Sequence, residues 1–169
     1  GTIVERGPLT VAKLPNMMVA LTESEPSMGS RETNMHHFGF KVRSMDKFLD
    51  KWRADGLEVG SIFFGSEGQL NAYVITPDNI AVDMQEDQGL HEEITGYHGH
   101  WFLDNHEEIL QWYVEMFDLE IRPRGRITTT TNVPGMNLSF GANNSGRQNT
   151  KGSAIDHIGF EIDNLEEFC

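Results

Sequence analysis

The 169-residue chain has one cysteine, its last residue, and few basic residues: 13 Lys and Arg stand against 26 Asp and Glu, for a formal net charge of −13. A lone cysteine excludes a disulfide within the chain. Nucleic acids and anionic membrane surfaces need clustered Lys and Arg, so the charge balance argues against both partners. Neither a signal-like apolar segment nor an apolar run of about 18 residues is present. We therefore expect a cytoplasmic protein.

What the sequence does contain is a repeat with a period of about sixty residues. Residues 37–48 read HFGFKVRSMDKF, residues 157–168 read HIGFEIDNLEEF, and a looser copy at 98–105 reads HGHWFLDN. Each copy opens with alternating residues, which is typical of a strand with two different faces. The apolar period then lengthens to about 3.6 residues, which indicates a helix. Each repeat is therefore predicted to begin with a strand and a helix, the histidine lying on the face opposite the apolar residues.

One complete module is predicted at 35–96. Ser44 can cap a helix that ends at Gly56, because apolar residues recur between them at helical spacing. Strands are predicted at 58–65, 70–76 and 80–85, with a turn at 77–79. The order of elements in this module is βαβββ.

A second βαβββ module and its closing linker are predicted at 97–154, with less regular strands at 121–131 and 136–140. Its helix carries a broad apolar stripe that we interpret as a core face. This stripe consists of Ile109, Trp112, Tyr113, Met116 and Phe117. Residues 155–169 are predicted to form the first strand and the start of the helix of a further module.

Residues 1–34 are predicted to hold the tail strands of an incomplete module, at 10–14 and 17–21, and a linker. The first strand and helix of that module are missing, so we expect the chain to be a fragment. Met17, Val19 and Leu21 should then bury against a partner chain or against sequence outside this one.

The histidines that recur at the module period are His37, His98 and His157. Neutral imidazole binds divalent ions. Asp83 lies between apolar neighbours in a predicted strand, where an unpaired carboxylate is costly. Two histidines and one carboxylate form the ligand set of facial-triad iron sites, and the same set suits zinc or manganese. The alternative for each residue is an ordinary hydrogen-bonded side chain on a sheet surface.

The other histidines are predicted to have different roles. His100 shares a face with His98 and is expected to lie beside the metal ligands without binding the ion. His36, His91 and His106 have no counterpart in the other copies and are expected to lie in solvent.

Repeated βαβββ modules, strands reading His-x-Gly-Phe and the stretch IDHIGFE at 155–161 resemble the vicinal oxygen chelate superfamily. That superfamily includes glyoxalase I, extradiol dioxygenases, and the fosfomycin and bleomycin resistance proteins. The resemblance implies an α+β fold in which modules pair into a cup-shaped, mostly antiparallel sheet with the helices outside. It also implies metal ligands on first and fourth strands. These ligands would be His37, Asp83, His98 and His157, whereas Ala20 and Ser139 stand where the family usually has Glu.

Two ways of pairing the modules stay open. If a 120-residue repeat is the natural unit, His98 and His157 share one cup, and His37 and Asp83 belong to another. If the two complete modules of this chain pair with each other, His37, Asp83 and His98 meet.

The functional prediction is a metal-dependent enzyme, with Fe²⁺, Mn²⁺ or Zn²⁺, acting on a small substrate that chelates the ion through two oxygens. Extradiol-dioxygenase-like chemistry is slightly favoured over isomerisation or lysis, and no general base can be named. The alternative is a metal-free protein that sequesters a small molecule, as bleomycin resistance proteins do. Ala20, Ser139 and the acidity favour that alternative. A homodimer or a larger assembly of modules is expected.

Overall fold

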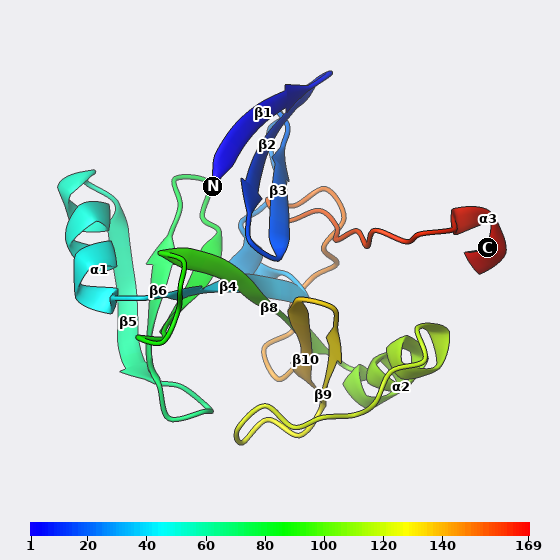
Figure 1. Ribbon diagram of the computed structural model, residues 1–169. Helices are drawn as coiled ribbons and strands as arrows, with labels where there is room; N and C mark the ends of the chain where they lie inside the picture. The colour runs from blue at the N-terminus through cyan, green and yellow to red at the C-terminus, as the bar shows by residue number, and fades with distance from the viewer.

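The computed structural model describes residues 1–169, and its largest element is one open sheet of seven strands (Figure 1). These strands are β4 (Met35–Val42), β5 (Glu58–Phe64), β6 (Leu70–Ile75), β7 (Ala81–Glu86), β8 (Ile94–Leu103), β9 (Thr130–Val133) and β10 (Met136–Ala142). Their order is β5-β6-β7-β4-β8-β10-β9. The pairs β4–β7 and β8–β10 are parallel, and every other neighbouring pair is antiparallel. The predicted α+β fold with a mostly antiparallel sheet is confirmed.

Two helices pack on the outer face of this sheet, one on each half (Figure 1). Helix α1 (Met45–Ala54) begins where predicted, because the Ser44 side chain accepts a hydrogen bond from the backbone N–H of Lys47. Gly56, just past its end, has a φ of 73°, a conformation that glycine adopts without strain. Helix α2 (His106–Met116) covers β8, β9 and β10.

Each helix closes its own hydrophobic core over the apolar face of its half-sheet. The core under α1 consists of Phe40, Val42, Met45, Leu49, Ala72, Val74, Val82 and Met84. The core under α2 consists of Met35, Trp101, Leu110, Leu138, Phe140 and Ile155. Because side chains alternate across a strand, residues between these core positions lie on the opposite face, and the recurring histidines of β4 and β8 are among them.

The second half of the sheet has one strand fewer than predicted. Residues 118–129 form a loop with two isolated bridges, Ile121 to Thr131 and Arg124 to Ile127. Pro123 has no N–H for a ladder, and Gly125 has a φ of 57°, so a continuous strand cannot form here. The predicted core stripe on α2 is also only partly buried, because Trp112 and Met116 are about half exposed.

The N-terminal residues form a separate three-stranded antiparallel sheet of β1 (Thr2–Arg6), β2 (Leu9–Leu14) and β3 (Met17–Leu21). Its β2–β3 turn docks on β8, where the Pro15 carbonyl accepts a 2.8 Å hydrogen bond from the Gly96 N–H. Met17 and Val19 pack against the core under α1. The expectation that Met17 and Val19 need another chain was therefore wrong. Leu21, in contrast, is 51% exposed. A partner chain over Leu21 stays a prediction.

Residues 155–164 contain no strand, although one was predicted there, and only the short helix α3 (Leu165–Phe168) follows. Ile158 and Phe160 of this segment lie against the core under α2. A short 3-10 helix, η1 (Ser30–Glu32), precedes β4. None of the three α-helices has the length and apolar character that crossing a membrane requires.

Candidate metal centre

Strands β4, β7 and β8 bring His37, Asp83 and His98 together on the face opposite the helices. In the strand pairing, Gly39 of β4 lies opposite both Asp83 and His98. A Cβ atom on Gly39 would lie 2.6 Å from Nδ1 of His98. The glycine of the His-x-Gly motif therefore makes room for the imidazole of the neighbouring module, which explains why this motif suits a shared site.

The three side chains present their ligand atoms to a common point. Nε2 of His98 lies 3.5 Å and Nε2 of His37 lies 3.9 Å from Oδ2 of Asp83. All three atoms lie within 4.8 Å of one another. Two ligands of one zinc ion, each about 2.1 Å from it, are separated by about 3 to 4 Å. The spacing therefore fits one divalent ion with little adjustment.

The same atoms lack hydrogen-bond partners. His37 is 1% exposed, His98 is 0% exposed, and Nε2 of His37 and both ring nitrogens of His98 are buried without a partner. Asp83, 5% exposed, accepts a 2.8 Å hydrogen bond on Oδ1 from the Asn71 amide, while its Oδ2 faces the histidines. Buried polar atoms are costly when unpaired. A divalent metal would satisfy Nε2 of both histidines and Oδ2 of Asp83, so these residues fit such an ion.

Protonation states agree with this assignment of donors. Burial lowers the pKa of His37 and of His98 well below the usual value, so both rings are neutral near pH 7. Burial raises the pKa of Asp83 to about 6, opposed by the Asn71 hydrogen bond and by the charge of Arg124. Neutral imidazole is the form that binds a metal.

The other predicted residues lie in different places. His100 lies beside the cluster, with its ring 5.1 Å from that of His37, and it stacks on Phe102. Burial lowers the pKa of His100 to about 3. The side chain of His157 is 81% exposed and contacts Asp156, and it does not join the other ligands. The structure thus corresponds to the pairing in which the two modules of this chain meet.

Sequence reasoning missed three residues around this cluster. His36 was expected in solvent, but its Nδ1 lies 2.7 Å from Nδ1 of His37, and burial lowers its pKa to about 4. Strand alternation alone could have placed Asn71 on the histidine face. Arg124 reaches the cluster from a loop, where no sequence pattern pointed to it.

Ser139 occupies the position on β10 that matches Asp83 on β7. It is fully buried, donates a 2.7 Å hydrogen bond to Oδ1 of Asn137, and accepts a 3.3 Å hydrogen bond from Nε of Arg124. Its hydroxyl is therefore engaged away from the histidines. Asp83 is the only carboxylate in the cluster of possible ligands.

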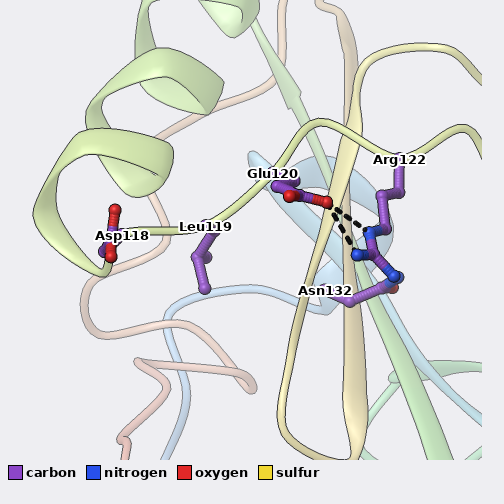
Figure 2. A pocket seen from close by; sticks show the side chains of 5 residues that line it. All are labelled: Asp118, Leu119, Glu120, Arg122 and Asn132. Carbon is purple, nitrogen blue, oxygen red and sulfur yellow. Dashed lines mark hydrogen bonds and ion pairs between the residues drawn. The ribbon is translucent and has the colours of Figure 1, made fainter.

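A separate surface hollow of about 280 Å³ lies next to the loop that follows α2, and Figure 2 shows its lining. Arg122 donates to Glu120 across it, at 2.7 Å. Its lining contains none of the histidines and consists of Asp118, Leu119, Glu120, Arg122 and Asn132. With its one arginine paired to Glu120, this hollow has no chemistry comparable to the histidine cluster.

Neither the scan of protein-family models nor the search of curated proteins found a match to the sequence. Among solved structures, a glyoxalase I mutant from Zea mays is similar with a TM-score of 0.56 and 12% identity, over 80% of this chain and 56% of that one. Methylmalonyl-CoA epimerase from Streptomyces coelicolor, in complex with 2-nitronate-propionyl-CoA, is similar with a TM-score of 0.46 and 15% identity, over 65% of this chain and 98% of that one. The methylmalonyl-CoA epimerase from Mycobacterium tuberculosis has a TM-score of 0.47 and 9% identity, over 65% of this chain and 91% of that one.

The chain is an α+β protein whose histidine-bearing strands meet at the centre of one open sheet. Its likeness to glyoxalase I shows that this is the fold of the vicinal oxygen chelate superfamily, as the sequence motifs predicted.

Proposed function

We propose that the chain is a metal-dependent enzyme acting on a small substrate that presents two neighbouring oxygens to a divalent ion. The observation that carries the proposal is the meeting of His37, His98 and Asp83, buried, with the ring nitrogens that face the carboxylate left unpartnered. The similarity in fold to glyoxalase I agrees with it.

The residues of the chain would hold such an ion and fix its surroundings. His37 and His98 would bind through Nε2, and Asp83 through Oδ2. The contact of His36 with Nδ1 of His37 and the Asn71 hydrogen bond to Asp83 restrict the orientation of two of these ligands. A bound divalent ion would supply Lewis-acid polarisation of the chelating oxygens or, as Fe²⁺, a site for oxygen chemistry.

Within this class, extradiol-dioxygenase-like chemistry is the reaction we favour. Two histidines and one carboxylate are the facial-triad ligand set. Isomerisation or lysis needs, in addition, a side chain that transfers protons at the substrate. Ser139, which stands where the superfamily usually has Glu, has its hydroxyl hydrogen-bonded to Asn137. The ligand set therefore supports the dioxygenase version more than the alternatives.

A metal-free binding protein is the alternative class, favoured by Ser139 and Ala20 at positions that usually carry a ligand. It leaves the buried nitrogens of His98 without any partner, which is costly.

Metal analysis of tag-free protein, reconstituted anaerobically with Fe²⁺, Mn²⁺ or Zn²⁺, separates the two classes. The enzyme proposal predicts a single tightly bound equivalent in the wild type and a large loss in Asp83→Asn, with Asp78→Asn in the exposed turn as the charge-matched control. A wild-type protein that retains no metal after reconstitution would rule out the enzyme proposal and favour the binding protein.

A further inference from the structure

Arg124 is the only Lys or Arg that is buried in this protein, at 7% exposure, and it lies in the loop between α2 and β9. The tip of that loop crosses to the loop between β5 and β6, where the Arg126 N–H donates to the Ser66 carbonyl at 3.1 Å (Figure 1). A Cβ atom on Gly125 would collide with Ser66, so glycine permits this close approach. The loop therefore carries Arg124 from the second half of the sheet toward the first half, on the side of the histidines.

The contacts of this guanidinium are few and long. Nε donates to Ser139 at 3.3 Å, and one terminal nitrogen lies 3.5 Å from Oε2 of Glu67. The group also lies over the ring of Tyr97, 5.6 Å from its centroid. Arginine has five N–H donors, and burying its charge is costly unless those donors are paired. The group is thus buried with spare capacity to bind an anion.

The Glu67 side chain shows that a carboxylate fits beside Arg124. The oxygen that pairs with Arg124, Oε2, also accepts a 2.7 Å hydrogen bond from the Tyr97 hydroxyl. A tyrosine hydroxyl is protonated at neutral pH and can donate this hydrogen bond. A hydroxyl and a guanidinium therefore converge on one carboxylate oxygen, and the carboxylate belongs to a partly exposed residue of a loop.

The region around Tyr97 and Arg124 adjoins the candidate metal centre. Tyr97 precedes His98, and the two rings lie 5.3 Å apart. Ser139, to which Arg124 donates, pairs in the sheet with His100, two residues after His98. An acid group held by Tyr97 and Arg124 would therefore belong to the same small molecule that reaches the metal centre.

We infer that Tyr97 and Arg124 form a subsite for a carboxylate of the substrate, and that the Glu67 carboxylate occupies this subsite until the substrate acid replaces it. The inference rests on the proposed function only in taking the ligand to be a chelator with two neighbouring oxygens. It names the substrate class as a small oxygen chelator that also carries an acid group.

The test uses a matched pair of probes, 3,4-dihydroxybenzoate and its neutral amide, titrated calorimetrically into the Mn²⁺-loaded protein without oxygen. The wild type should bind the acid about tenfold more tightly than the amide, the size expected for hydrogen bonds to a charged group. Arg124→Gln should remove that preference. Glu67→Gln should strengthen binding of the acid and leave binding of the amide unchanged, because the competing carboxylate is gone. Arg126→Gln, an exposed arginine two residues along the same loop, is the control and should behave as the wild type.

Equal binding of acid and amide by the wild type, or an unchanged preference in Arg124→Gln, overturns the inference. If Arg124→Gln does not fold, Glu67→Gln decides: tighter acid binding supports the subsite, and unchanged or weaker binding overturns it. If the wild type takes up no metal, the proposed function fails on its own. The same titrations of the metal-free protein then decide the subsite by the same criteria.

Discussion

The two halves of the sheet place different chemistry at matching positions. On β7, Asp83 accepts a hydrogen bond from Asn71 and directs its other oxygen to two histidines. On β10, Ser139 donates to Asn137 and accepts from Arg124. Both positions are buried on the histidine face. The repeat fixes where a side chain points, and residue identity then decides whether the position faces the two histidines or closes a hydrogen-bond network.

The surroundings of the two positions differ for a structural reason. The first half has all four strands, so Asp83 is flanked by Asn71 and Tyr73 of β6. The second half lacks the corresponding strand, and its loop inserts Arg124 beside Ser139. We therefore expect substitutions at and around Asp83 to change metal binding and the matched substitutions at and around Ser139 to change only stability.

The largest effect is expected for Asp83→Asn, compared with Ser139→Ala. Asp83→Asn should weaken metal binding by about 100-fold or more, since losing a group that only supports a ligand already costs about 10- to 100-fold. Ser139→Ala should leave the affinity unchanged. Competition titrations with a chelating dye measure both. Equal affinities for Asp83→Asn and wild type would remove Asp83 from the site.

Gly39→Ala, compared with Gly159→Ala in the third copy of the motif, should have the next largest effect. A methyl group on Gly39 collides with the His98 ring, whereas nothing lies within 4 Å of a Cβ atom on Gly159. Gly39→Ala should lower the free energy of unfolding by about 1 to 3 kcal/mol, as overpacking does. It should also weaken metal binding. Urea denaturation and metal titration are the measurements, and indistinguishable results for the two variants would contradict this role of Gly39.

A smaller effect is expected from Asn71→Leu, compared with Asn137→Leu. Asn71→Leu removes the only hydrogen bond to the Asp83 carboxylate and should weaken metal binding by about tenfold. Asn137→Leu should lower the free energy of unfolding by about 1 to 3 kcal/mol, because it leaves buried groups unpaired. Its metal affinity should match the wild type. A loss of metal affinity in Asn137→Leu would show that both halves support the ion.

The smallest effect is expected for His157→Ala. Its imidazole is exposed and contacts only Asp156, so metal content should equal that of the wild type, whereas His98→Ala should lose most of the metal. Elemental analysis of the two variants, purified side by side, decides the matter. A loss of metal in His157→Ala would restore the pairing in which His98 and His157 share a cup.

Much of the fold could be predicted from the sequence because the repeat and the alternation are strong local signals. The α1 cap at Ser44 and the strands of the first half followed from such signals. The missing strand at 121–129 did not, because Pro123 and Gly125 break a ladder that the repeat alone suggested. In the candidate site, His37 and His98 were predicted from their recurrence and Asp83 from its place between apolar neighbours in a strand, whereas no pattern pointed to Arg124. It reaches the site through a loop-to-loop contact between distant residues, which leaves no periodic pattern.

X-ray absorption spectroscopy of the metal-loaded protein counts the imidazole rings around the ion and so reports which side chains hold it. We expect two imidazoles and a carboxylate oxygen in the wild type, one imidazole in His98→Ala, and two in His157→Ala. A wild-type spectrum without imidazole scattering, or a His98→Ala spectrum identical to that of the wild type, would contradict the claim that His37, Asp83 and His98 hold the ion.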